Sequence, residues 1–289
     1  MNIPGVTIIK GSKAGPKVGI IACTHGNEPT GLSILRQLKT IKPTHGTLIL
    51  IHNNLKATRL KKRFCDLNMN RLPSDALSQK SPKQYEVKRL QQLYPILKNL
   101  DYVLDIHTTS AMPEPFVVIL TKTIPAIAKK LGIPNIISNM AKIQKDKAFI
   151  SFCGSSKAIR IGVECGLHGT KESRQTAQTA AINFLSEIGI IKKGKIPTTW
   201  PRPALYQLIG SIMAPQRGYK LTRLLKPFEK LKKGEHILIK KGSKPVIIPF
   251  SCQVLLPPKT TTIQYPNEEL FFTIKQLGNH ETLSHSTKE

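Results

Sequence analysis

Along the first two-thirds of the chain, short apolar runs typical of buried strands alternate with segments whose apolar residues have the spacing of amphipathic helices. Continuous short apolar runs predict strands at residues 18–23, 47–52, 102–106, 116–120 and 159–165. Apolar positions three and four apart predict helices at residues 29–38, 81–97 and 176–188. This order predicts an α/β fold, with a mainly parallel or mixed sheet flanked by helices.

Cap residues mark the start of the second of these helices. Ser81 is a suitable N-cap, Pro82 suits the first helical position, and Gln84 stands three residues after the cap. The helix is therefore predicted to begin at Ser81.

The composition of the sequence changes near residues 193–203, where glycine and proline become frequent. Beyond that stretch, short apolar runs predict strands at residues 236–239, 246–250 and 252–256. We therefore expect a larger domain of residues 1–196, followed by a smaller β-rich domain of residues 197–289.

Composition describes a globular chain with a core. Its 289 residues are 40% hydrophobic and 21% charged, which excludes a disordered or collagen-like protein. No apolar run approaches the ~20 residues of a membrane span, and the N-terminus predicts no signal peptide. The five cysteines form no Cys-x-x-Cys pair, which argues against a disulfide scaffold or a cysteine-only zinc site. We expect a cytoplasmic protein.

The net charge of +27 attracts anions of every kind. However, the basic residues are spread along the chain, and aromatic residues make up only 6% of it. A platform for stacked bases is therefore disfavoured, and a solvated basic surface explains the charge better than a nucleic-acid site does.

Two histidines and a carboxylate stand where predicted strands end. His25 and Glu28 follow the strand at 18–23, and His107 follows the strand at 102–106. Ligands of open α/β sheets bind beyond the carboxyl ends of strands. Two histidines and one carboxylate are the ligands of a catalytic zinc site, which lowers the pKa of bound water to about 7. Either histidine alone also fits a hydrogen-bonded loop residue, so the zinc hypothesis depends on all three.

Further polar residues have the chemistry to act on a substrate. Arg63 and the pair Asn70-Arg71 are expected in a loop, where guanidinium groups suit a carboxylate or a developing oxyanion. A solvated basic turn would explain the charge but not the Asn-Arg pairing. Glu164 ends an apolar strand, where a carboxylate is costly unless it is paired or serves as an acid or base. The sequence leaves these two interpretations of Glu164 even.

Four motifs, in order and spacing, resemble the aspartoacylase/succinylglutamate desuccinylase family, relatives of the zinc carboxypeptidases. They are Thr24-His25-Gly26-Asn27-Glu28, Asp66-Leu67-Asn68-Met69-Asn70-Arg71, Asp105-Ile106-His107-Thr108-Thr109 and Gly162-Val163-Glu164-Cys165-Gly166. The resemblance implies a zinc-dependent amide hydrolase, with one zinc ion held by His25, Glu28 and His107. It also implies that Arg63 polarises the carbonyl, that Asn70 and Arg71 bind a substrate carboxylate, and that Glu164 is the general base and acid.

This chain departs from the family pattern in two places. Where aspartoacylase has an arginine for the second substrate carboxylate, this chain has Gly154, and the nearest arginine is Arg160. The family's C-terminal Asn-Glu with paired tyrosines is matched by Asn267-Glu268-Glu269-Leu270-Phe271-Phe272, and phenylalanine has no hydroxyl group. We therefore expect an intact metal site beside an altered specificity pocket.

Together these residues predict a zinc-dependent hydrolase that deacylates a small anionic N-acyl amino acid. Within enzymes the alternative is a carboxypeptidase-like peptidase. The alternative from another class is a basic protein that binds nucleic acid or a membrane surface on a degenerate enzyme fold. Homo-oligomerisation stays open. Asp105, two residues before His107, is expected to orient one of the metal ligands.

Overall fold

The computed structural model describes residues 3–144, 147–192, 202–213, 215, 218–262 and 269–278. Its strands are β1 (Val6–Lys10), β2 (Lys17–Ala22), β3 (Thr47–His52), β4 (Tyr102–Thr109), β5 (Phe116–Val118), β6 (Asn135–Ser138), β7 (Ile159–Leu167), β8 (Ala204–Met213), β9 (Lys220–Leu221), β10 (Lys230–Leu231), β11 (His236–Ile239), β12 (Val246–Ile247), β13 (Cys252–Leu255) and β14 (Glu269–Gln276). Its α-helices are α1 (Pro29–Leu38), α2 (Leu55–Arg59), α3 (Tyr85–Leu97), α4 (Ala141–Gln144) and α5 (Lys171–Ile188). Three 3-10 helices are η1 (Met69–Arg71), η2 (Ala126–Lys130) and η3 (Phe149–Phe152).

Most strands belong to one large mixed sheet. Its strand order is β1-β3-β2-β4-β7-β5-β6-β8-β14-β13-β10, and a second sheet has the order β12-β11-β9. The pairs β3–β2, β2–β4, β4–β7, β5–β6 and β6–β8 are parallel. The pairs at both ends of the large sheet, and β5–β7, are antiparallel. The predicted α/β class with a mixed, helix-flanked sheet is confirmed.

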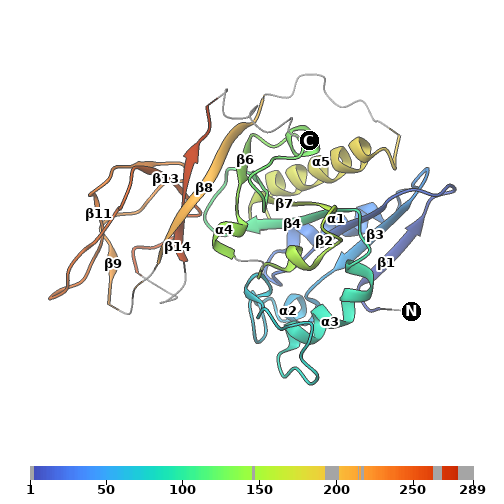
Figure 1. The fold of residues 1–289 in the computed structure, drawn as a ribbon, viewed down its shortest axis with the longest axis horizontal. Coiled ribbons are helices and arrows are strands. Elements are labelled where there is room, and N and C mark those ends of the chain that lie inside the picture. The colour runs from blue at the N-terminus through green and yellow to red at the C-terminus, as the bar shows by residue number, and fades with distance from the viewer. Residues whose placement is uncertain are drawn as a thin grey trace.

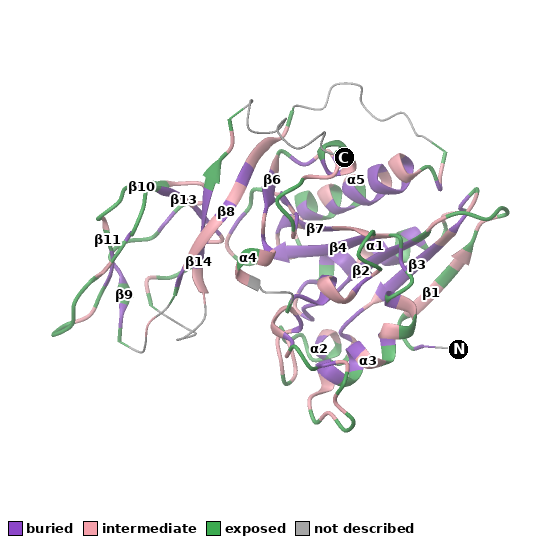
Figure 2. Cartoon of the chain, viewed as in Figure 1, coloured by how far each residue is buried: buried purple, intermediate pink, exposed green. Residues whose placement is uncertain are grey.

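Helices cover both faces of the N-terminal half of this sheet (Figure 1). On one face, Ile20 of β2 packs in a core with residues of α1 and α5, such as Ile34 and Phe184. On the other face, the next residue Ile21 packs with residues of α3, such as Leu90. The central strands are accordingly buried along their length (Figure 2). Burial on both faces explains why these strands are continuous apolar runs in the sequence.

Two predicted helix starts are wrong, for reasons that depend on caps. Helix α3 begins at Tyr85 rather than Ser81, because the Asp66 carboxylate accepts a hydrogen bond from the Tyr85 backbone N–H at 2.7 Å. Helix α5 begins at Lys171 rather than residue 176, because the Thr170 side chain caps it by accepting from the Ser173 N–H at 3.1 Å. Helix α1 has the predicted bounds.

The C-terminal third is β-rich, as predicted, and it continues the large sheet. Residues Asn135–Ser138 of β6 pair in parallel with β8, and β14, β13 and β10 follow in order. Figure 1 shows β8 and β14 extending the sheet away from α5. The predicted boundary between residues 196 and 197 lies outside the described residues. None of the helices in the described ranges is long and apolar enough to cross a membrane.

Candidate active site

A tight turn after β2 brings His25 and Glu28 together. The strand ends at Ala22, and Cys23 takes a positive φ of 56°. A Cβ on Gly26 would lie 2.1 Å from the carbonyl carbon of Ala57, so the turn packs directly on α2 in a way that requires glycine. Glu28 is the residue before α1, and its Oε1 lies 2.6 Å from Nδ1 of His25.

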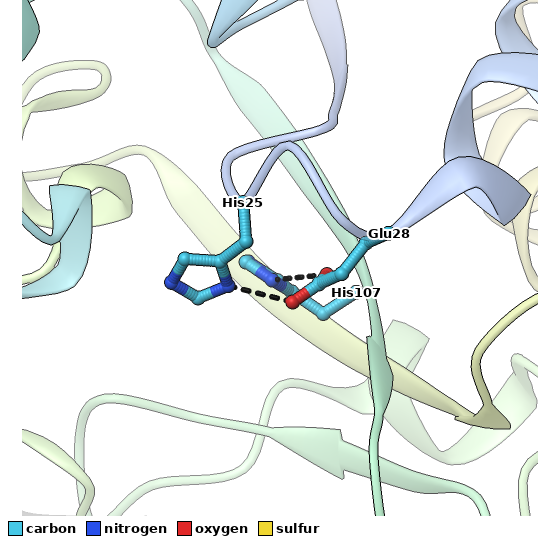
Figure 3. Close-up of side chains that lie close together, drawn as sticks. All are labelled: His25, Glu28 and His107. Atoms are coloured by element: carbon cyan, nitrogen blue, oxygen red, sulfur yellow. Dashed lines mark hydrogen bonds and ion pairs between the residues drawn. The ribbon is translucent and has the colours of Figure 1, made fainter. Parts of the chain in front are cut away.

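His107 completes a buried cluster with these two side chains (Figure 3). It lies on β4, which pairs with β2, and its Nδ1 is 3.1 Å from Oε2 of Glu28. The ligand atoms of the three residues all lie within 4.8 Å of one another. The sequence placed His107 just beyond its strand, but β4 continues to Thr109 and includes it. The turn and the strand together form a site that could hold a metal ion.

The outer nitrogen of each histidine faces an oxygen. Nε2 of His107 lies 3.0 Å from Asp105, whose other oxygen accepts a hydrogen bond from Thr24 Oγ1 at 3.1 Å. Nε2 of His25 lies 3.1 Å from Oδ1 of Asn68. When Nε2 carries the proton and donates it to these oxygens, Nδ1 of each ring has a free lone pair facing Glu28. Asp105 therefore orients His107.

Charges inside the cluster shift its pKa values strongly. Burial raises the pKa of Glu28, but both histidines outweigh it and hold that pKa well below its usual range. Burial lowers the pKa of His107, but Asp105 and Glu28 hold it well above its ordinary value. Burial lowers the pKa of His25. A buried set of two imidazole nitrogens and one carboxylate suits a transition-metal ion, whereas calcium and magnesium prefer oxygen ligands alone.

Glu164 lies beside the cluster without a partner. It stands on β7 directly opposite His107, and its Oε2 is buried with no hydrogen bond to any residue that the structure describes. Burial is the main cause that raises the pKa of this carboxyl group to about 8. An unpaired buried carboxyl group next to a candidate metal site is suited to proton transfer.

A cavity of about 90 Å³ adjoins these groups. Asp105, His107 and Glu164 line it, and so do Asn70 and Arg71. The rest of the lining is largely apolar and includes Phe116, Val118, Met140, Ile150, Leu256 and Phe272. A small apolar space with a few convergent polar groups is typical of a ligand site.

The loop that carries Arg63, Asn70 and Arg71 is held by a residue that sequence reasoning missed. Glu86 of α3 is fully buried, and its carboxylate accepts hydrogen bonds from three successive backbone N–H groups, those of residues 65–67, at 2.7 to 3.1 Å. It also accepts one from Asn54 Nδ2 at 3.1 Å. In the sequence, Glu86 has only the signal of an acidic residue in a predicted helix.

The structure places the three polar residues of this loop differently. The Arg63 guanidinium lies 3.9 Å from Glu28 Oε1, and its side chain is 47% exposed. Asn70 lines the cavity and accepts a hydrogen bond from the Phe149 N–H at 3.2 Å. Arg71 also lines the cavity, but its guanidinium forms a 2.8 Å ion pair with Glu269 of β14.

The structure shows the surroundings of the two positions at which the chain departs from the family pattern. Gly154 has a φ of 71°, and a Cβ there would lie 2.5 Å from the Leu100 carbonyl oxygen, so no arginine fits this position as it stands. Arg160 lies outside the cavity lining, and its guanidinium donates to the carbonyl oxygens of Cys153 and Ser155. Phe272 lines the cavity, whereas Asn267 and Glu268 lie outside the described residues.

Comparisons with known proteins agree with the fold. Among solved structures, succinylglutamate desuccinylase/aspartoacylase from Rhodobacter sphaeroides has a TM-score of 0.68 at 15% identity, over 94% of this chain and 89% of that one. Succinylglutamate desuccinylase from Vibrio parahaemolyticus has a TM-score of 0.71 at 14% identity, over 95% and 86% of the two chains. Murine aminoacylase 3 has a TM-score of 0.65 at 19% identity, over 92% and 97%. At these low sequence identities, the TM-scores establish a shared fold.

The sequence matches a family model but no individual curated protein. No curated protein matches the chain by sequence. A family model does match residues 14–193, and it describes the succinylglutamate desuccinylase/aspartoacylase catalytic domain. The matched segment contains the turn after β2, the loop held by Glu86, and strands β4 and β7. The chain belongs to the succinylglutamate desuccinylase/aspartoacylase family.

Proposed function

We propose that this protein is a zinc-dependent hydrolase that deacylates N-acyl amino acids. The observation that supports this best is the buried cluster of His25, Glu28 and His107 beside a cavity lined by Glu164, whose Oε2 has no hydrogen bond to a described residue. Family membership supports the reaction class, since relatives are named as desuccinylases, aspartoacylases and aminoacylases.

His25, Glu28 and His107 would hold the zinc ion through two imidazole nitrogens and a carboxylate oxygen. When bound, zinc lowers the pKa of a water molecule and polarises the acyl carbonyl. Asp105 would accept the Nε2–H of His107, which leaves Nδ1, the nitrogen that faces Glu28, as the one that would bind the zinc ion.

Glu164 would move the protons. Its Oε2 has no hydrogen bond to a described residue that would have to break first, so this oxygen could accept a proton from the attacking water. The same oxygen would then deliver this proton to the leaving amine. Arg63, whose guanidinium lies 3.9 Å from Glu28, would donate to the developing oxyanion.

Asn70 and Arg71 would bind the substrate carboxylate, for which Glu269, the present partner of Arg71 Nη2, would compete. A second substrate carboxylate would find neither an arginine at Gly154 nor a hydroxyl at Phe272. Each missing charge-assisted hydrogen bond costs about 1.5–3 kcal/mol of binding. We therefore propose a substrate with one carboxylate and an apolar group for the cavity, and not N-acetylaspartate as the best substrate.

The test is a hydrolysis screen with zinc-loaded protein. We expect kcat/KM to be higher for acetylated methionine, leucine or phenylalanine than for acetylated aspartate or glutamate. The absence of hydrolysis across the series would refute the reaction class, and a clear preference for N-acetylaspartate would refute the proposed pocket.

Two variants distinguish loss of zinc binding from loss of proton transfer. Wild-type protein should hold about one zinc ion per chain. His107→Ala should lose zinc, because it removes a ligand. Glu164→Gln should keep zinc and lose most of kcat, because an amide cannot accept the proton of water. Equal zinc content in wild type and His107→Ala, or near-normal turnover by Glu164→Gln, would contradict these assignments.

A further inference from the structure

A glutamate from the last strand holds the arginine that faces the cavity. Nη2 of Arg71 donates to Oε2 of Glu269 at 2.8 Å, and Nη1 donates to the backbone oxygen of Asn70 at 2.7 Å. Among the described residues that line the cavity, Arg71 is the one lysine or arginine. Its positive charge is therefore already matched by a carboxylate of the protein itself.

The pairing of β14 explains how Glu269 reaches this position. Phe272 of the same strand lines the cavity, although residues three apart in a regular strand point to opposite faces. The register between β14 and β8 shifts between Glu269 and Phe271, and this irregularity allows Phe272 to line the cavity while Glu269 contacts Arg71. An irregularity that redirects a side chain beside a ligand site changes which groups a ligand meets there.

The geometry points to Glu269 as a specificity-determining residue that competes with a substrate carboxylate for Arg71. This inference rests on the proposed function, because it concerns the carboxylate end of the same substrate. The side chains of Arg71 and Glu269 are 33% and 17% exposed, so their pair is only partly screened by solvent. A ligand carboxylate on Arg71 would stand next to the Glu269 carboxylate, and like charges in that position repel.

Two consequences follow for the substrate. A carboxylate that binds through Nη2 of Arg71 must displace Glu269, and one that binds through another N–H of the guanidinium still lies near the Glu269 charge, so its binding is weakened in either case. A ligand whose carboxylate is replaced by a neutral amide escapes this competition. Removing the charge of Glu269 should therefore improve the binding of the acid and leave the binding of the amide as it is.

The experiment compares N-acetylmethionine with N-acetylmethioninamide. Binding is measured by calorimetry on zinc-loaded protein in the Glu164→Gln background, so that the ligands persist, with and without Glu269→Gln. We expect Glu269→Gln to lower the Kd of the acid about tenfold, the change that one charge-assisted hydrogen bond supplies, with the Kd of the amide unchanged. The matched control is Glu235→Gln, which removes an acidic partner of a different arginine, Arg223, and should change neither Kd.

The outcomes separate this inference from the proposed function. An equal change for acid and amide, no change for the acid, or no binding of either ligand would overturn the role of Glu269. Turnover is measured separately on zinc-loaded protein that retains Glu164. If no acyl amino acid is hydrolysed but Glu269→Gln still gains affinity for the acid alone, the proposed reaction fails and the competition for Arg71 stands.

Discussion

Replacing Glu86 by glutamine tests how the loop beside the candidate active site is held. The wild-type carboxylate is fully buried and accepts hydrogen bonds from the backbone N–H groups of Cys65, Asp66 and Leu67 and from Asn54. Glutamine has nearly the same shape, but one of its oxygens becomes an NH₂ group. That group meets N–H donors, so two of the four hydrogen bonds are lost in either orientation of the amide.

The free-energy change follows from the number and kind of these bonds. A hydrogen bond to a charged group contributes about 1.5–3 kcal/mol, so two lost bonds cost about 3–6 kcal/mol of unfolding free energy. This is a large fraction of the ~5–15 kcal/mol that stabilises a typical protein. Because the loop also carries Arg63, Asn70 and Arg71, we expect kcat/KM to fall as well.

Urea unfolding of the zinc-loaded proteins measures the first effect, and hydrolysis of N-acetylmethionine measures the second. The matched control is Glu114→Gln, an exposed glutamate that should change the unfolding free energy by less than about 0.5 kcal/mol. A loss below about 1 kcal/mol for Glu86→Gln would refute the reasoning, because the three backbone donors would then need no carboxylate.

Three further substitutions have defined outcomes. Gly26→Ala should lower zinc content, because a Cβ 2.1 Å from Ala57 displaces the turn that carries two ligands; normal metal content would contradict the tight packing. Asp105→Asn should weaken zinc binding about 10- to 100-fold in competition with a chelator, since the carboxylate on His107 Nε2 is lost. Phe272→Ala should reduce kcat/KM for N-acetylphenylalanine about tenfold or more while N-acetylalanine is less affected, and equal losses would show that the ring does not contact the substrate side chain.

The parts of the fold that were predictable are those whose burial is complete. Strand β3, at Thr47–His52, is an apolar run because both faces of the central sheet are covered, and its predicted bounds are confirmed. Strand β1 was missed, because it is a half-exposed edge strand with polar residues among its apolar ones. The predicted cap at Ser81 satisfied every local rule, but the distant Asp66 carboxylate determines where α3 begins. A non-local hydrogen bond of this kind leaves no local pattern.

In the candidate active site, too, features with a local sequence pattern were predictable, and contacts between distant residues were not. His25, Glu28 and His107 could be proposed together because parallel strands end at one edge of a sheet, and the structure brings them into one cluster. Strand alternation placed Asp105 on the face of His107 without showing which ligand it orients, and the structure shows that its carboxylate meets Nε2 of His107. Glu269 could not be placed from sequence, because it meets Arg71 across 198 positions of the chain.

That separation has a consequence for the order in which the site is assembled. The candidate metal ligands all lie within the first 107 residues, whereas Glu269 and Phe272 belong to the last described strand. At a synthesis rate of about 5–20 residues per second, the ribosome needs roughly 8 to 30 s to travel from His107 to Glu269. During that interval the two histidines and Arg71 are already synthesised, whereas the strand that carries Glu269 and Phe272 is not. The carboxylate partner of Arg71 and the ring of Phe272 are therefore synthesised well after the candidate metal ligands that they lie near.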